Sequence, residues 1–189
     1  MDNLTSPKVV KSILEKHGFH FTKSLGQNFL IDDNILKKIV KAADINPEDR
    51  ILEIGAGIGT LTCKLASLAK KVVTVEIDER LLPILGETLA DFQNITLIHG
   101  DILKIDLVKL IHDLFDNLSF KIVANLPYYI TTPIIMGILE QGVPFESITV
   151  LIQKEVAERI VASPGNKDYG ALSVAVILIP RRCYYSLRN

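Results

Sequence analysis

The chain has 189 residues, of which 48% are hydrophobic and 23% are charged, and its net charge is −1 at pH 7. This length and composition predict one globular domain with a sizeable core and exclude a disordered or low-complexity protein. The near-neutral charge gives no support for a polyanionic partner, except that seven lysines lie within residues 1–41. Such a basic arm points to a phosphate-bearing partner, although a solvated charged surface explains it equally well.

Cysteine usage and hydropathy indicate the compartment. Cys63 and Cys183 are far apart and show neither disulfide-framework nor metal-site spacing, which is typical of a reducing cytoplasm. The N-terminus has no apolar segment of the signal-peptide kind, and no apolar run is long enough to span a membrane. We therefore predict a cytoplasmic protein without a membrane partner.

Strand-like and helix-like segments alternate along the chain. Asp32 or Asp33 is expected to cap the first helix, whose apolar side chains form one stripe. Strands rich in Val and Ile that alternate with helices predict a mostly parallel α/β sheet with helices on both faces. Ligands of such sheets bind at the carboxyl ends of the strands. In chain order we predict helices over 34–43, 60–69, 79–90, 108–115, 132–140 and 156–162, and strands over 50–54, 71–76, 95–99, 121–124, 147–152 and 172–179.

A glycine-rich loop, Gly55-Ala56-Gly57-Ile58-Gly59, follows the first predicted strand. Glycines in this position let the backbone approach a ligand closely. The dinucleotide-binding fingerprint is Gly-x-Gly-x-x-Gly, whereas this chain has Thr60 in place of the last glycine and an acid, Glu53, two residues before the first. A tight turn without a ligand is the alternative interpretation.

Single acids follow the second and third predicted strands. Glu76 lies about twenty residues after Gly55, where a carboxylate can accept from both ribose hydroxyls of an adenosine-type ligand. Asp101 can accept from an adenine amino group, and a turn cap is its alternative role. Glu76 and the glycine loop together favour ligand binding over a plain turn.

The motif Asn125-Leu126-Pro127-Tyr128 follows the fourth predicted strand and suits methylation of an adenine amine. The amine lone pair is delocalised into the ring, so a catalyst must hold the N–H protons and favour a pyramidal nitrogen. The Asn125 side-chain oxygen and the Leu126 carbonyl are suitable acceptors, Pro127 fixes the local backbone, and Tyr128 offers a ring for base stacking. A proline turn with core tyrosines is the alternative interpretation.

The methyl donor implied by this chemistry is S-adenosylmethionine. Its sulfonium already makes transfer favourable, so the protein has to supply orientation and electrostatics. We predict no metal, because the four histidines are scattered and no His, Cys and Asp cluster is evident.

Together these motifs resemble the ribosomal RNA adenine N6-dimethyltransferase family, and within it the bacterial small-subunit (16S) branch. A second tyrosine, Tyr129, favours this branch over the large-subunit macrolide-resistance methylases, which usually have Asn there. The resemblance extends over residues 10–176. The stretches that carry it are 23–30, 53–59, 76–78, 100–103, 125–133, 153–159 and 169–173.

The resemblance implies a Rossmann-like class I methyltransferase. Its expected activity is dimethylation of two adjacent adenines in the 3′-terminal hairpin of small-subunit RNA during ribosome biogenesis, by a monomer acting on the immature subunit. Asn125 is expected to hold the target amine, with Leu126 and Pro127, and Tyr128 to stack on the target base. The expected donor contacts are Gln27, Asn28, Leu30, Gly55, Glu76, Asp101 and Asn125.

The resemblance also predicts three parts: an arm and helix (1–45) that close over the donor site, a donor-binding catalytic domain (46–176) and a tail (177–189) unlike the family. Family members continue into a final sheet hairpin and a small helical domain. Suitable codons for the tail, read one nucleotide out of frame, give a family-like continuation, so we hypothesise a frameshifted or truncated gene product. Without its last strand, the fifth strand is expected to be an unpaired edge and an aggregation hazard.

Two other functions compete with the methyltransferase. A non-catalytic RNA- or ribosome-binding assembly factor, or an inert remnant, is favoured by the missing C-terminal part and disfavoured by the complete 125–128 motif. A nicotinamide-dependent oxidoreductase is disfavoured by Thr60 in place of the third fingerprint glycine.

Overall fold

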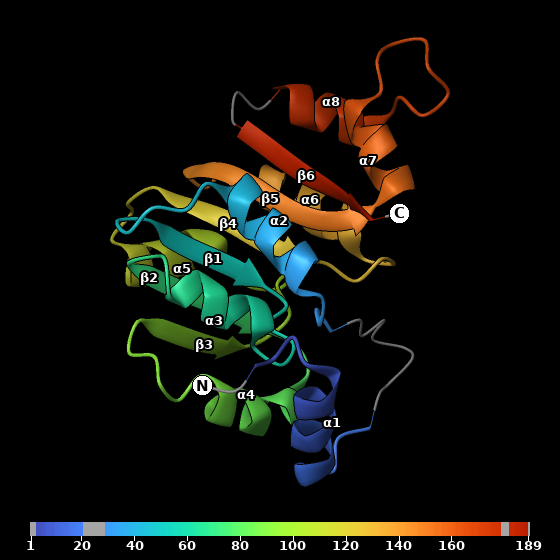
Figure 1. Ribbon diagram of the computed structural model, residues 1–189. Coiled ribbons are helices and arrows are strands. Elements are labelled where there is room, and N and C mark those ends of the chain that lie inside the picture. Colours follow the sequence, from blue (N-terminus) through green and yellow to red (C-terminus); the bar gives the residue numbers. More distant parts are fainter. Residues whose placement is uncertain (1–2, 21–28, 179–181, 189) are drawn as a thin grey trace.

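The computed structural model describes residues 3–20, 29–178 and 182–188 (Figure 1). The strands of this part form one sheet in the order β3-β2-β1-β4-β5-β6, and every neighbouring pair is parallel. The predicted α/β class is therefore confirmed. The strands are β1 (Arg50–Ile54), β2 (Lys71–Glu76), β3 (Ile95–His99), β4 (Phe120–Asn125), β5 (Phe145–Gln153) and β6 (Arg182–Arg188).

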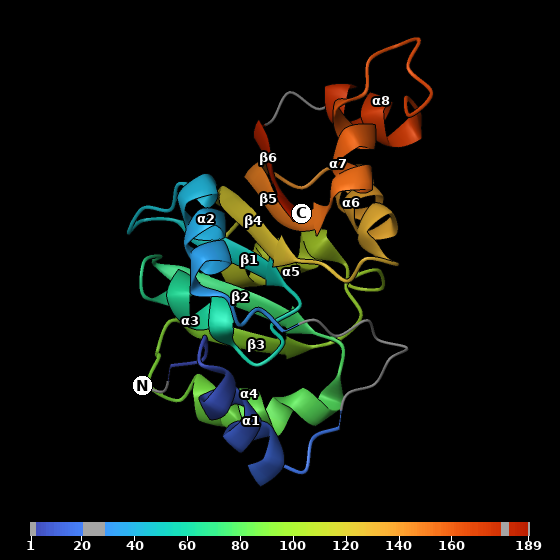
Figure 2. The ribbon, with the colours of Figure 1, turned by 45° about the vertical axis from the view of Figure 1, so that its right-hand side comes forward.

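Helices cover both faces of the sheet, as Figures 1 and 2 show from two directions. In the part of the chain that the structure describes, α2 and α3 lie on one face, α5 and α6 lie on the other, and α1 packs beside α4 below β3. No helix among these residues is long and apolar enough to cross a membrane. The helices are α1 (Pro7–Lys16), α2 (Asp33–Ala43), α3 (Thr60–Ala66), the 3-10 helix η2 (Glu79–Leu81), α4 (Leu82–Thr88), α5 (Leu107–Phe115), α6 (Thr131–Glu140), α7 (Lys154–Val161) and α8 (Ala171–Leu178).

Successive residues of the central strands pack into opposite layers of the core. Ile51 of β1 lies in the cluster formed with α2 and α3, whereas Leu52 lies in the cluster formed with α5 and α6. Val72 and Val73 of β2 divide in the same way, and all four side chains are fully buried. Because both faces are buried, the strands read as continuous apolar runs without alternation.

Side-chain caps mark the starts of two helices, of which the first was predicted. The Asp32 carboxylate accepts hydrogen bonds from the backbone N–H groups of Asn34 (2.8 Å) and Ile35 (3.2 Å), so Asp32 is the cap of α2. Asp106 caps α5 through the N–H of Lys109. Each cap satisfies backbone donors that have no partner within the helix. The sequence analysis did not predict α1, which begins at Pro7.

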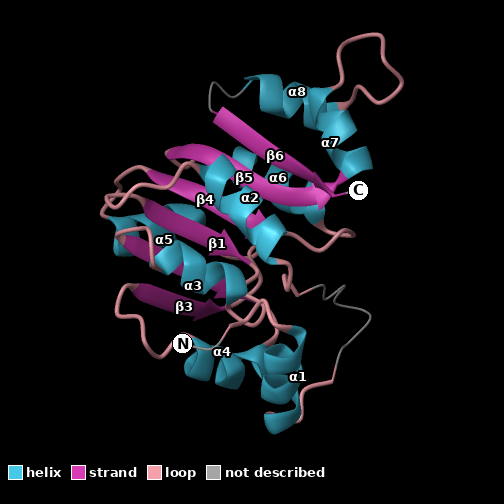
Figure 3. Ribbon diagram, in the orientation of Figure 1, coloured by secondary structure: helices cyan, strands magenta, loops and turns pink. Residues whose placement is uncertain are grey.

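The predicted strand over 172–179 is wrong, because residues 172–178 belong to α8 (Figure 3). Nearly every residue of this run is apolar, so its hydrophobic periodicity cannot distinguish a buried strand from a buried helix. A capping interaction decides for the helix: the Ser173 hydroxyl accepts from the N–H of Gly170, three residues earlier, and donates to the carbonyl of Arg159. The reach of a side chain in the first turn back to the N-cap N–H is one half of a capping box.

The expected unpaired edge at the fifth strand is also wrong. β6 pairs with β5 in parallel, from Ser147 opposite Arg182 to Gln153 opposite Arg188. The tail that looked unlike the family therefore supplies the backbone partner that β5 needs, and the edge position passes to β6.

Proline at Tyr184 or at Tyr185, which lies opposite Val150 in the ladder, tests this pairing. Alternate N–H groups of an edge strand point toward and away from its neighbour, so one of the single variants Tyr184→Pro and Tyr185→Pro removes a ladder donor. We expect that variant to lower the free energy of unfolding by about 1–3 kcal/mol and to promote aggregation. Urea unfolding and light scattering over a concentration series measure both effects. Tyr184→Val and Tyr185→Val keep the N–H and are the controls. If neither proline variant differs from its valine control, β6 does not protect β5.

Candidate active site

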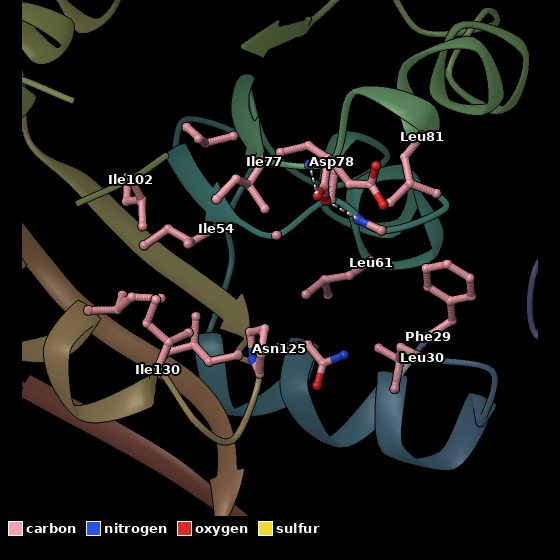
Figure 4. Close-up of a pocket in the computed structure, with 18 of the residues that line it drawn as sticks. Phe29, Leu30, Ile54, Leu61, Ile77, Asp78, Leu81, Ile102, Asn125 and Ile130 are labelled. Carbon is pink, nitrogen blue, oxygen red and sulfur yellow. Dashed lines mark hydrogen bonds between the residues drawn. The ribbon is translucent and has the colours of Figure 1, made fainter. Parts of the chain in front are cut away.

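One pocket lies at the carboxyl ends of β1, β2, β3 and β4 and brings the four predicted strand-end motifs together (Figure 4). Leu30, from the segment before α2, lies across it from these strand ends. Gln27 and Asn28, which the sequence analysis also assigned to the donor, lie outside the described residues. The predicted residues that line the pocket are Leu30, Gly55, Glu76, Asp101, Asn125, Leu126, Pro127 and Tyr128.

The glycine loop takes backbone conformations that other residues rarely adopt. Gly57 has a φ of 59°, and a Cβ on it would lie 3.3 Å from the Phe29 ring. Gly59 has a φ of 89°, and a Cβ there would lie 2.9 Å from a methyl carbon of Leu89, just after α4. The third glycine therefore allows close helix packing one position earlier than in the dinucleotide fingerprint, which explains why Thr60 is tolerated.

Glu76 is buried at the end of β2, and its carboxylate joins two loops. One oxygen accepts from the N–H of Gly57 at 2.8 Å, and the other accepts from the N–H of Asp78 at 3.0 Å. Burial raises the pKa of Glu76, and these backbone hydrogen bonds oppose that rise because they favour the charged form. The carboxylate is thus held rigidly against the floor of the pocket.

Asp101 is a turn cap whose side chain also lies at the pocket, so its predicted contact with adenine stays a prediction. It lines the pocket, and one carboxylate oxygen also accepts from the N–H of Leu103 at 3.1 Å, as a turn cap does. Lys104 lies 3.7 Å from the other oxygen but is mostly exposed. The turn bond fixes the side chain in place, and a carboxylate has further lone pairs for a ligand.

The 125–128 motif is anchored on both sides. The Leu126 side chain is buried in the core cluster that includes α6 residues, and the Asn125 carbonyl lies 3.8 Å from the position of a Cβ on Gly55. The Pro127 carbonyl accepts from the N–H of Ile130 (3.3 Å) and from the Thr131 hydroxyl (3.0 Å). It therefore serves to start α6. Asn125 and Leu126, the other two predicted amine acceptors, also line the pocket.

Sequence reasoning missed the apolar walls of the pocket. Phe29, Ile77, Leu81 and Ile102 line it and surround its polar groups in Figure 4. Ile77 is 51% exposed, which is unusual for a large apolar side chain next to a buried strand. A signal was present, since an isoleucine directly follows each strand-end acid, Glu76 and Asp101. Such a pair suits a nucleoside, because the acid can accept hydrogen bonds from its polar groups and the isoleucine can contact the flat ring.

Glu53, noted only as a departure from the fingerprint, is fully buried beneath the glycine loop. Neither of its carboxylate oxygens has a hydrogen-bond partner of ordinary geometry among the described residues. Burial raises the pKa of Glu53 to about 7, and the nearby hydroxyls of Thr62 and Thr74 oppose the rise only in part. Below neutral pH this side chain is therefore a neutral acid in the core.

Glu53 gives the stability of the protein a pH dependence. Its pKa rises from 4.5 to about 7 on folding, so its contribution is complete below pH 4.5 and is lost as the pH rises through about 7. Over that window we expect the parent to lose about 3 kcal/mol of unfolding free energy relative to Glu53→Gln. Urea unfolding at pH 5, 6, 7 and 8 measures the difference. Glu140→Gln, at an exposed carboxyl, controls for general charge effects. Parallel profiles for parent and Glu53→Gln would contradict the assignment.

Within the ranges that the structure describes, no group of three or more His, Cys, Asp or Glu side chains is placed to hold a metal ion.

Comparison with known proteins decides the family. The family model described as "Ribosomal RNA adenine dimethylase" matches residues 18–179. This chain belongs to the ribosomal RNA adenine dimethylase family. Membership overturns the nicotinamide-dependent alternative and agrees with the motifs around the pocket.

Curated relatives agree with the family. The chain is 58% identical over 176 residues to ribosomal RNA small subunit methyltransferase A of Alkaliphilus metalliredigens, which covers 93% of this chain and 61% of that protein. It is 53% identical to the protein of the same name from Clostridioides difficile, again covering 93% of this chain and 61% of the relative. The chain thus spans about three-fifths of the length of the curated relatives that it matches.

Solved structures identify the fold as that of class I S-adenosylmethionine-dependent methyltransferases. A dimethyladenosine transferase from Plasmodium falciparum superposes with a TM-score of 0.66 at 33% identity, over 80% of this chain and 52% of that one. The 23S rRNA methyltransferase ErmE superposes with a TM-score of 0.63 at 32% identity, over 79% of this chain and 56% of that one.

Proposed function

We propose that the protein transfers methyl groups from S-adenosylmethionine to the N6 amines of two adjacent adenines in the 3′-terminal hairpin of small-subunit (16S) ribosomal RNA. One observation carries the proposal: an acid-and-glycine donor site and the 125–128 motif open into one pocket of a chain that belongs to this family. The substrate is then the immature small ribosomal subunit, which the monomeric protein meets in the cytoplasm. The names of the curated relatives, ribosomal RNA small subunit methyltransferase A, support methylation of small-subunit RNA.

The pocket has the chemistry that the donor requires. The rigid Glu76 carboxylate is suited to accept from the ribose hydroxyls, and Asp101 to accept from the adenine amino group. Ile77 and Ile102 offer apolar contact to the adenine ring, and Gly55 lets the methionine part approach the backbone. S-adenosylmethionine supplies an activated methyl group on sulfur. The 1–45 segment, through Leu30, closes the donor side in this proposal.

The other end of the pocket suits the adenine that receives the methyl group. The Asn125 side-chain oxygen and the Leu126 carbonyl accept from the amine protons and favour the pyramidal nitrogen that attacks the methyl carbon. The methyl–sulfur bond breaks as the nitrogen–carbon bond forms, S-adenosylhomocysteine leaves, and the nitrogen then releases one proton to water. The Tyr128 ring stacks on the base and holds it in line. Held acceptors and a fixed approach are the main contributions available to an enzyme whose donor is already reactive.

Donor binding depends on Glu76 in this proposal. Replacing Glu76 by Ala removes the ribose acceptor and releases the N–H groups of Gly57 and Asp78, so we expect the Kd for S-adenosylmethionine to rise at least about tenfold. Calorimetric titration measures it, and circular dichroism verifies the fold of each variant. The surface variant Glu140→Ala is the control. A folded Glu76→Ala chain with parental affinity would refute this donor site.

Base binding depends on the Tyr128 ring. Loss of a stacking ring costs about 1–3 kcal/mol, so we expect Tyr128→Ala to lower kcat/KM for the RNA about tenfold to a hundredfold. Tyr128→Phe keeps the ring and should retain most of the activity. Donor affinity should stay close to that of the parent in both variants. If Phe and Ala are equally impaired, the hydroxyl rather than the stacking surface is what matters.

The reaction itself is tested on small ribosomal subunits that lack the modification. The purified chain and S-adenosylmethionine are expected to produce dimethyladenosine at two adjacent positions of the 3′-terminal hairpin, detected by mass spectrometry of the digested RNA. Asn125→Ala should abolish the product. Binding of donor and subunits without product from the parent would overturn the catalytic proposal and favour a non-catalytic assembly factor.

A further inference from the structure

Arg80, in η2 beside the pocket, makes a two-pronged ion pair with Asp78. Its Nε donates to one carboxylate oxygen at 2.8 Å, and its Nη2 donates to the other. The Asp78 side chain is only 4% exposed, whereas that of Arg80 is 43% exposed. A planar guanidinium can satisfy both oxygens at once, which a lysine ammonium cannot do in the same geometry.

The same guanidinium contacts the N-terminal segment after α1. It lies over the Phe19 ring, 5.1 Å from the ring centre, and its Nη1 donates to the His20 carbonyl at 3.4 Å. A cation over an aromatic face is attracted by the negative face of the ring. Arg80 therefore links two segments that are about sixty positions apart in the sequence.

Both contacts lead to the same carboxylate. On one side, the N–H of Asp78 donates to Glu76 at 3.0 Å. On the other, the Phe19 ring lies 5.9 Å from that of Phe29, and Phe29 covers Gly57, whose N–H donates to Glu76 at 2.8 Å. Arg80 is thus connected to both donors of the Glu76 hydrogen bonds: directly to Asp78, and to Gly57 through the two phenylalanine rings.

Charge points to the same role. Burial is the main cause that raises the pKa of Glu76, and the negative charge of Asp78 adds to the rise. Arg80 pairs with Asp78 and so places a positive charge beside that carboxylate. An ordinary exposed ion pair between neighbours of one short helix contributes little. This pair differs because the carboxylate is buried, the geometry is two-pronged and the cation also holds an aromatic ring.

We propose that Arg80 is a positioning residue for methyl-donor binding: it holds Asp78 on one side and the Phe19–Phe29 ring pair on the other, so that Glu76 meets the donor in a fixed place. The inference rests on the donor site described under the proposed function. Arg80 itself contacts neither donor nor RNA in this account. Its loss is therefore expected to act on donor affinity more than on the chemical step.

Two single variants separate positioning from charge. Arg80→Lys keeps the positive charge but loses the two-pronged geometry, and Arg80→Gln loses both. We expect the Kd for S-adenosylmethionine, measured by calorimetry, to rise about tenfold in both variants. In methylation assays the KM for the donor should rise in parallel, while kcat at saturating donor and the KM for RNA stay within about twofold.

Glu87→Ala is the matched control. Glu87 of α4 pairs with Lys16 and His17 at the end of α1, each at 2.8 Å, so this variant also cuts a link between the N-terminal segment and the domain, away from the pocket. We expect parental donor affinity. Equal losses in Glu87→Ala and the Arg80 variants would show that general loosening of the segment is responsible, and would overturn the inference.

The double variant Asp78→Asn, Arg80→Gln removes the buried charge together with its partner and so protects the fold. Restored affinity in this chain would mean that Arg80 only neutralises Asp78, which overturns the positioning role; affinity that stays low supports it. A parent that binds no donor refutes the proposed function and this inference with it. A parent that binds, with Arg80→Lys and Arg80→Gln binding equally well, refutes only the role of Arg80.

Discussion

The site depends on one buried carboxylate held between two strand ends. Glu76 ends β2, and its oxygens accept from the N–H of Gly57 in the loop after β1 and from the N–H of Asp78 in the turn after β2. A buried carboxylate is costly unless its charge is met by hydrogen bonds. The same bonds that meet this cost fix the relative position of the two loops that form the donor side of the pocket.

The parallel sheet supplies the rigid frame for this arrangement. β1 lies between β2 and β4, so the glycine loop, Glu76 and the 125–128 motif leave neighbouring strands at the same edge. Both faces of these strands are buried, which leaves little freedom for their ends to move independently. The pocket therefore opens to ligand above strands that are buried on both faces of the sheet.

Much of the fold and site was predictable because it is local. Capping by Asp32, the alternation of strands and helices, and the strand-end acids all depend on residues close together in sequence. The C-terminal part was not predictable in this way. The Ser173 hydroxyl of α8 contacts the carbonyl of Arg159, fourteen residues earlier, and β6 pairs with β5, more than thirty residues earlier. Neither partner can be read from the segment itself.

The sequence alone indicated the fold class and the identity of the polar groups around the pocket, because these groups directly follow apolar runs that can be recognised as strands. Tertiary structure decided which of those groups already interact with other parts of the protein. It engages the Pro127 carbonyl in α6, leaves Glu53 buried without a hydrogen-bond partner among the described residues, and places Arg80 between Asp78 and Phe19. These outcomes depend on which distant segments pack together, and spacing along a single chain does not contain that information.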